Sequence, residues 1–245
     1  MKVTEEQLRL LIKSALIQEA TMSRRDIKGA SIKVGDDFES SNKIEDLPSL
    51  SGIQFQTVSK ETPADKASEE LSFWEGGNRK ESENSDDSNQ KLKDYWDAAK
   101  YQYPKPNLWS EPWSAAFISF VMKEGGISDF PFSGAHTTWA TKALENRKAL
   151  SEDPSKFKNK ELYILFKRDE VKPQKGDLAF RLREGGIDTW IKSGGGKAKS
   201  HSDVFISPNE VIGGNLGDSV KKAKFDHPTI IKKIKVLGTK EKESE

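Results

Sequence analysis

The chain has 245 residues, of which 34% are hydrophobic and 32% are charged, and this composition is too polar for one uniformly packed globule. Lys and Arg number 40 against 39 Asp and Glu, so binding of nucleic acid through charge alone is not expected. The absence of cysteine excludes disulfides, a thiolate zinc site and a cysteine nucleophile.

Residues 1–20 are predicted to form an amphipathic helical leader. Thr4 and Gln7 have the spacing of a capping box, and apolar residues recur at helical intervals after them. A secretory signal is not expected, because Glu5, Glu6 and Arg9 interrupt its charge and apolar pattern. No window of the sequence is apolar enough for a membrane helix. The helix either docks on its own domain or addresses the protein to a larger assembly, such as a phage or an injection apparatus.

Residues 21–90 are predicted to be an acidic, low-complexity and largely disordered linker. The stretch from Asp36 to Asp87 holds 14 acidic and 5 basic residues and few apolar ones, which cannot offset the entropy of ordering. Two apolar islands interrupt it, GIQFQTV and LSFWEGG. These islands either pack on a folded neighbour, bind a partner or have no role. We favour the first of these, in the form of a strand added to the C-terminal domain.

Residues 91–245 are predicted to form one α+β domain, in which helices pack on an antiparallel sheet. SAAFISFVMKE is apolar on almost every side and precedes Gly125 and Gly126, which predicts a central buried helix beginning at Ser114. A second helix is expected from His136 to Leu150. The β-like runs that follow are LYILF, GDLAFRL, HSDVFI, EVIGGN and TIIKKIKVL, with a hairpin between HSDVFI and EVIGGN.

The succession PWSAAFISFVMKEGG, SGAH, PQKGDLAF, HSDVFI and VIGGN resembles the papain-like peptidoglycan hydrolases of the CHAP and NlpC type. It is more closely similar to an uncharacterised bacterial and phage family within that superfamily, over residues 92–230. The resemblance implies a papain-like fold with a nucleophile at the start of the long helix. The matching positions are Ser114, Asp177, His201 and Asn215, and Ser114 stands where the superfamily usually has cysteine.

The residues themselves support two roles for Ser114. At a helix start, backbone N–H groups and the helix dipole stabilise a developing anion, so Ser114 can act as a nucleophile if a base lies within hydrogen-bond reach. The alternative is an ordinary helix N-cap. His201, at the start of an alternating strand, is the expected base, and Asn215 is expected either to orient His201 or to serve as a turn residue.

Further polar and aromatic residues are expected to line the substrate cleft. His136 lies near Ser114 or caps its own helix, Asp177 closes a turn, and Asp203 pairs with a lysine or faces the cleft. Trp113 and Trp139 stack on sugars or pack in the core. The spacing of the histidines has no metal-binding signature, so no metal is expected.

The resemblance implies hydrolysis of an amide in peptidoglycan, as an amidase or endopeptidase, through Ser114, His201 and Asn215 and with no cofactor. The alternatives are an inactive papain-like module that binds the cell wall or builds a phage or injection apparatus, and an amidase or acyltransferase for another amide. Nucleic acid and membranes are not expected partners. With no secretory signal, we expect cytoplasmic synthesis and then virion association or delivery to the wall.

Overall fold

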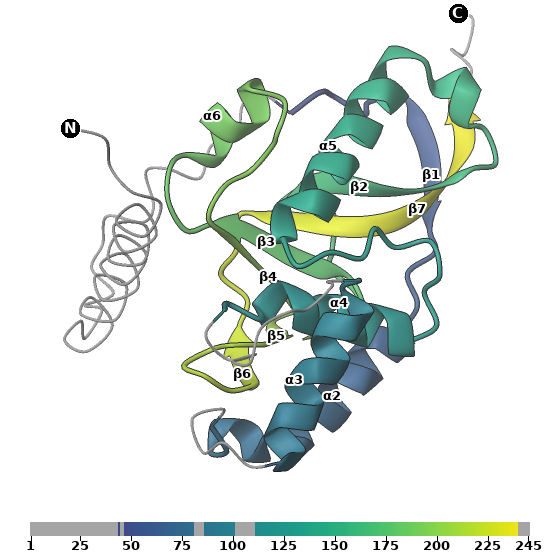
Figure 1. Cartoon of the computed structure of the whole chain (residues 1–245). Coiled ribbons are helices and arrows are strands. Elements are labelled where there is room, and N and C mark those ends of the chain that lie inside the picture. Colours follow the sequence, from purple (N-terminus) through teal and green to yellow (C-terminus); the bar gives the residue numbers. More distant parts are fainter. Residues whose placement is uncertain (1–43, 45–46, 81–85, 101–110, 240–245) are drawn as a thin grey trace, which may run out of the picture. The chain divides into compact units, whose positions relative to one another are not determined.

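The computed structural model describes residues 44, 47–80, 86–100 and 111–239 (Figure 1). The chain divides into two units, 1–40 and 41–245, and the fold below belongs to the second. The leader predicted over residues 1–20 lies outside the described residues. Among the described helices, none has the length and apolar character needed to cross a membrane.

A seven-stranded antiparallel sheet forms the centre of the fold, in the order β1-β7-β3-β4-β5-β6, with β2 also paired to β7. The long strand β7 therefore holds three other strands together. The strands are β1 (Ile53–Thr57), β2 (Glu161–Lys167), β3 (Leu178–Leu182), β4 (Ser200–Ser207), β5 (Glu210–Gly213), β6 (Lys221–Lys224) and β7 (Thr229–Thr239). The five β-like runs predicted after residue 150 are all present, and the expected hairpin is β4–β5, with Val204 opposite Ile212.

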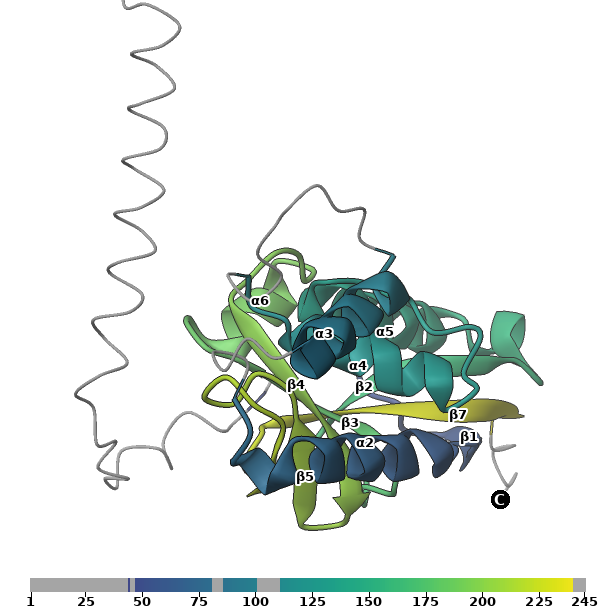
Figure 2. The same cartoon turned by 60° about the horizontal axis from the view of Figure 1, so that its bottom comes forward.

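Helices α4 and α5 lie on the same side of this sheet, where α4 contacts β4 and α5 contacts β2 (Figures 1 and 2). Every residue from Ser114 to Met122 in α4 is buried, as the apolar pattern predicted. The fold is thus α+β, with helices packed on an antiparallel sheet. The helices are α2 (Thr62–Phe73), α3 (Asp86–Ala98), α4 (Ser114–Glu124), α5 (His136–Glu152) and α6 (Ile187–Lys192), with short 3-10 turns η2 (Glu75–Gly77) and η5 (Pro154–Phe157).

The region predicted as a linker, residues 21–90, contains folded elements, so the domain boundary at residue 91 is too late. The first island is β1, which pairs with β7 and confirms the expected added strand. The second island is not a strand, because it forms the end of α2 and η2. Trp74 within it is fully buried and stacks on Trp113, with ring centroids 5.3 Å apart. A few large apolar side chains therefore anchor a stretch whose average composition is polar.

Polar contacts also tie this early segment to the sheet. Arg147 is buried in α5, and its Nε donates to the carbonyl oxygen of Pro48 at 2.7 Å while both Nη atoms bind the Glu170 carboxylate. Ser59 donates to the Asp177 carboxylate, which also accepts from Lys232 at 2.6 Å. Such contacts join residues far apart in the sequence, and composition alone does not reveal them.

Replacing Trp74 with alanine tests whether this segment belongs to the core. Because its side chain is fully buried, Trp74→Ala should lower the free energy of unfolding by about 3–5 kcal/mol in urea denaturation. The exposed Leu237 provides a control, and Leu237→Ala should change stability by less than about 0.5 kcal/mol. An equally small loss for Trp74→Ala would show that the segment is not part of the cooperative core.

Candidate functional site: a serine–histidine pair beside a His–Asp–His group

Ser114 is the first residue of α4, and its hydroxyl oxygen lies 2.8 Å from Nε2 of His136. The N-cap of α4 is Trp113, and no side chain caps this helix end. The Ser114 hydroxyl is therefore used for the histidine and not for helix capping. Both side chains are buried, with Ser114 4% and His136 5% exposed.

His136 begins α5, which brings its ring over to the start of α4. Burial lowers the pKa of His136 well below its ordinary value, and the positive charge of Arg183 adds to this effect. The imidazole is therefore neutral at physiological pH and can accept a proton from Ser114. Its other ring nitrogen, Nδ1, is buried and has no hydrogen-bond partner among the described residues.

A second polar group lies at the start of β4 and in the loop before β7. Nε2 of His201 is 2.8 Å from one carboxylate oxygen of Asp203, and Nε2 of His227 is 2.9 Å from the other. These are ion-pair distances, although the ring N–H bonds are not aligned with the oxygens as in a straight hydrogen bond. Nδ1 of His227 lies 3.0 Å from Asp226, so both of its nitrogens face carboxylates.

The negative charge of Asp203 and the positive charge of His227 stabilise each other. Burial alone would raise the pKa of Asp203, but His201 and His227 outweigh it and hold the pKa well below its usual range. Burial also opposes a charged His227, yet Asp203 and Asp226 raise its pKa above the ordinary value. Asp203 is therefore ionised, and His227 favours the imidazolium form.

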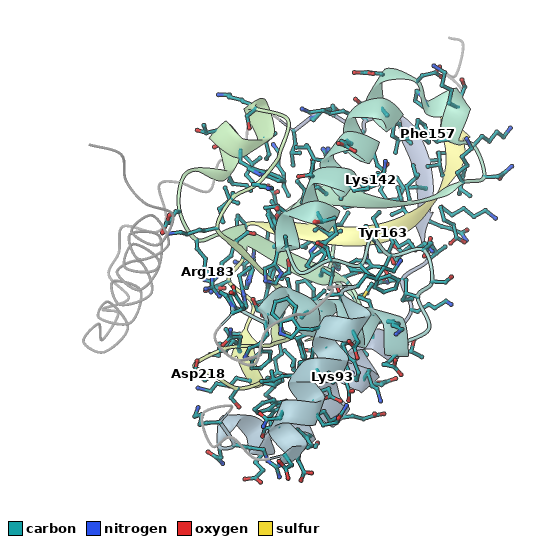
Figure 3. The ribbon with its side chains drawn as sticks, in the orientation of Figure 1. Lys93, Lys142, Phe157, Tyr163, Arg183 and Asp218 are labelled. Carbon is teal, nitrogen blue, oxygen red and sulfur yellow. The ribbon has the colours of Figure 1, made fainter. Side chains whose placement is uncertain are left out.

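Arg183 determines the tautomer of the neutral His201 ring. It directly follows β3, and its Nη2 lies 3.1 Å from Nδ1 of His201 (Figure 3 labels Arg183). A guanidinium can only donate hydrogen bonds, so Nδ1 accepts and the imidazole proton is on Nε2, facing Asp203. Both nitrogens of His201 are thus engaged. The structure therefore corrects the expected pairing of Ser114 with His201, because the serine's partner is His136.

The two groups meet at the histidine rings. The ring centroids of His136 and His201 are 5.3 Å apart in an edge-to-face arrangement, and those of His201 and His227 are 6.4 Å apart. Asp203 also favours the charged form of His136. The three histidines of the chain are consequently gathered around one ionised carboxylate.

The glycines of the VIGGN motif allow close packing at the site. A Cβ at Gly213 would lie 1.8 Å from Oδ1 of Asp203, and one at Gly214 would lie 2.5 Å from Cβ of Phe117. These glycines allow the end of β5 to approach both the carboxylate and α4. Asn215 follows them at φ 57°, and no hydrogen bond of its side chain occurs within the described part of the chain. The structure thus places Asn215 in a turn and does not bring it to His201.

The other expected cleft residues take structural positions. Trp113 is fully buried against Trp74, and Trp139 is fully buried with its Nε1 donating to Ser202 Oγ at 3.1 Å. Neither offers an exposed face for a sugar, which removes support for a wall-binding module based on these rings. Asp177 pairs with Lys232 at the opposite end of β3 from the Arg181–His201 pair, so it is not part of the site.

Sequence reasoning missed His227 and Arg183. His227 lies before β7 without a recognisable motif, and only the small number of histidines, three in the whole chain, was a signal for it. Among the described residues, no group of three or more His, Asp or Glu is arranged to hold a metal ion.

Fold and site together define a class: an α+β protein with a buried Ser–His pair next to a buried His–Asp–His group. The chain belongs to a bacterial family described as "Uncharacterized protein conserved in bacteria (DUF2272)", whose sequence profile matches residues 68–233 and thus every residue of the site. No curated protein and no solved structure gives a significant match.

The contacts of the histidines predict their protonation states in solution. His227 should carry protons on both nitrogens at mildly acidic pH, and the neutral imidazole of His201 should carry its proton on Nε2. Two-bond 1H–15N correlation spectra of the imidazoles distinguish these forms. A proton on Nδ1 of His201 would contradict the Arg183 contact.

The same contacts predict opposite pH dependences for two variants. A histidine with a raised folded pKa stabilises the fold below its unfolded pKa of about 6.5, and this contribution is lost as pH rises. The stability advantage of the native chain over His227→Gln should therefore shrink above about pH 6.5. For His136, whose pKa is lowered, the advantage over His136→Gln should grow as pH rises toward that value. Urea unfolding across this range measures both, and parallel curves would contradict the assignment.

Proposed function

We propose that the protein is a serine hydrolase that cleaves an amide bond, with Ser114 as nucleophile and His136 as general base. The observation that carries this proposal is the 2.8 Å contact between Ser114 Oγ and Nε2 of a buried histidine whose pKa is lowered. A serine hydroxyl needs a neutral base in direct hydrogen-bond contact, and this pair supplies it.

In the proposed reaction, His136 takes the hydroxyl proton as Ser114 Oγ attacks the amide carbonyl carbon. The tetrahedral intermediate collapses when His136 returns the proton to the departing amine, which leaves an acyl ester on Ser114. A water molecule then attacks the ester. His136 accepts one of its protons and gives it to Oγ, which restores the enzyme and releases the acid.

Two features stabilise the charges that form. The first N–H groups of α4 have no acceptor within the helix, and the positive end of the helix dipole favours an oxyanion at this position. Asp203 favours the charged form of His136, so it stabilises the imidazolium during the reaction. His201 and Asp203 are in this account positioning residues, and the base is His136.

For the substrate we propose an amide of peptidoglycan, either the sugar-to-peptide link or a peptide cross-link. This rests on the resemblance to papain-like wall hydrolases and on the common arrangement of a nucleophile at the start of a central helix beside an antiparallel sheet. The proposed base differs from that pattern, because it comes from the start of α5 and not from the first residues of β4.

Hydrolysis of purified sacculi tests the proposal. Ser114→Ala and His136→Gln should each lower product release by about 100-fold or more, because each removes one half of the reacting pair. Combining them should cost little more than either alone. Asn215→Ala should retain most of the activity, since among the described residues its side chain makes no hydrogen bond to Ser114, His136 or His201. Equal turnover for the native chain and Ser114→Ala would refute the nucleophile. Large losses for Ser114→Ala and Asn215→Ala, with His136→Gln still active, would favour the expected triad instead.

A further inference from the structure

Arg183 is only partly satisfied by the protein. Its Nη2 contacts His201, and among the described residues no carboxylate lies within ion-pair distance of its guanidinium. Arg147 shows the contrast, since Nε and both Nη atoms there bind a carbonyl and a carboxylate. Arg147 is buried, whereas Arg183 is exposed, so the remaining N–H groups of Arg183 face solvent and are accessible to a ligand.

Two other polar nitrogens near His201 also have no acceptor. Nδ1 of His136 is buried without a hydrogen-bond partner, and the same holds for Nε of Arg181. Arg181 lies opposite His201 in the sheet, and its nearest acid is Asp226, at 3.7 Å. The side chains around His201 therefore hold more hydrogen-bond donors than the protein's own acceptors satisfy.

The local acids are already engaged. Asp203 contacts His201 and His227, and Asp226 contacts His227 at 3.0 Å. Taking His227 as the imidazolium, the group has three positive side chains, those of Arg181, Arg183 and His227, against the two carboxylates. The group therefore has one positive charge more than its carboxylates neutralise, together with unused hydrogen-bond donors. Both features favour binding of an anionic ligand.

We propose that Arg183 binds a carboxylate of the substrate, so that the enzyme prefers amides in acidic peptides over their neutral counterparts. The planar guanidinium presents paired N–H groups that match a carboxylate in a bidentate contact. Arg183 contacts His201, and the ring centroid of His201 lies 5.3 Å from that of His136, which places this charge near the reacting pair. The inference rests on the proposed function, because it names the substrate class of that same site.

Binding to the full-length Ser114→Ala protein tests the inference without turnover. One probe pair is N-acetyl-alanyl-alanine and its C-terminal amide, and a second is N-acetyl-glutamyl-alaninamide and its glutaminyl counterpart, so each pair differs only in a carboxylate. Calorimetry should show that at least one acid binds about tenfold or more tightly than its matched amide. Adding Arg183→Gln should abolish that difference, and Arg183→Lys should retain only part of it. Arg79→Gln, at a surface arginine paired with Glu75, should leave it unchanged.

The outcomes separate the two proposals. Equal binding of acid and amide in both pairs would overturn the carboxylate site, whatever the turnover of the native chain. So would a preference that survives Arg183→Gln, or binding of inorganic phosphate with no preference among the peptides. A native chain that hydrolyses nothing while the preference depends on Arg183 would refute the proposed reaction alone. If Arg183→Gln fails to fold in thermal unfolding, the acid-against-amide comparison and Arg183→Lys still decide the question.

Discussion

The site depends on one buried carboxylate, that of Asp203. An ionised carboxylate without partners is very costly in a protein interior, and here His201 and His227 each contact one of its oxygens. This constraint fixes the ring of His201 and draws the loop before β7 toward β4. It also explains Gly213, where a side chain would collide with the carboxylate. Removing either histidine would leave one oxygen of the buried Asp203 carboxylate without its partner.

Beside this group, the Ser114–His136 pair has a different environment. Both residues begin helices, and the packing of α4 and α5 on the sheet brings their side chains to 2.8 Å. Burial keeps His136 neutral, whereas nearby carboxylates favour a charged His227. Two histidines near the same aspartate thus have opposite tendencies, because His227 touches the carboxylate and His136 does not. This division is what makes His136 suitable as a base.

Much of the fold was readable from the sequence, because apolar periodicity predicts local elements well. The buried helix from Ser114, the helix from His136 and the strands after residue 150 follow from such patterns. The linker prediction failed over residues 47–80 because it averaged the composition. Charge and serine content hid Trp74 and the pairing of β1, which depend on distant partners. Ser114, His136, His201 and Asp203 were recognised, but their pairing was not. The order of helices and strands in the sequence predicts that His201 lies near the start of α4. It does not predict the contacts with Arg183 and Asp203, which orient the ring nitrogens of His201.

The central claim, that Ser114 is a nucleophile activated by His136, is tested most directly by covalent trapping. The native protein is incubated with a fluorophosphonate, and the intact mass and the modified peptide are determined by mass spectrometry. The account predicts a single adduct on Ser114 that His136→Gln abolishes and Asn215→Ala retains. An unmodified Ser114 in the folded native chain, or an adduct that forms equally well in His136→Gln, would contradict it.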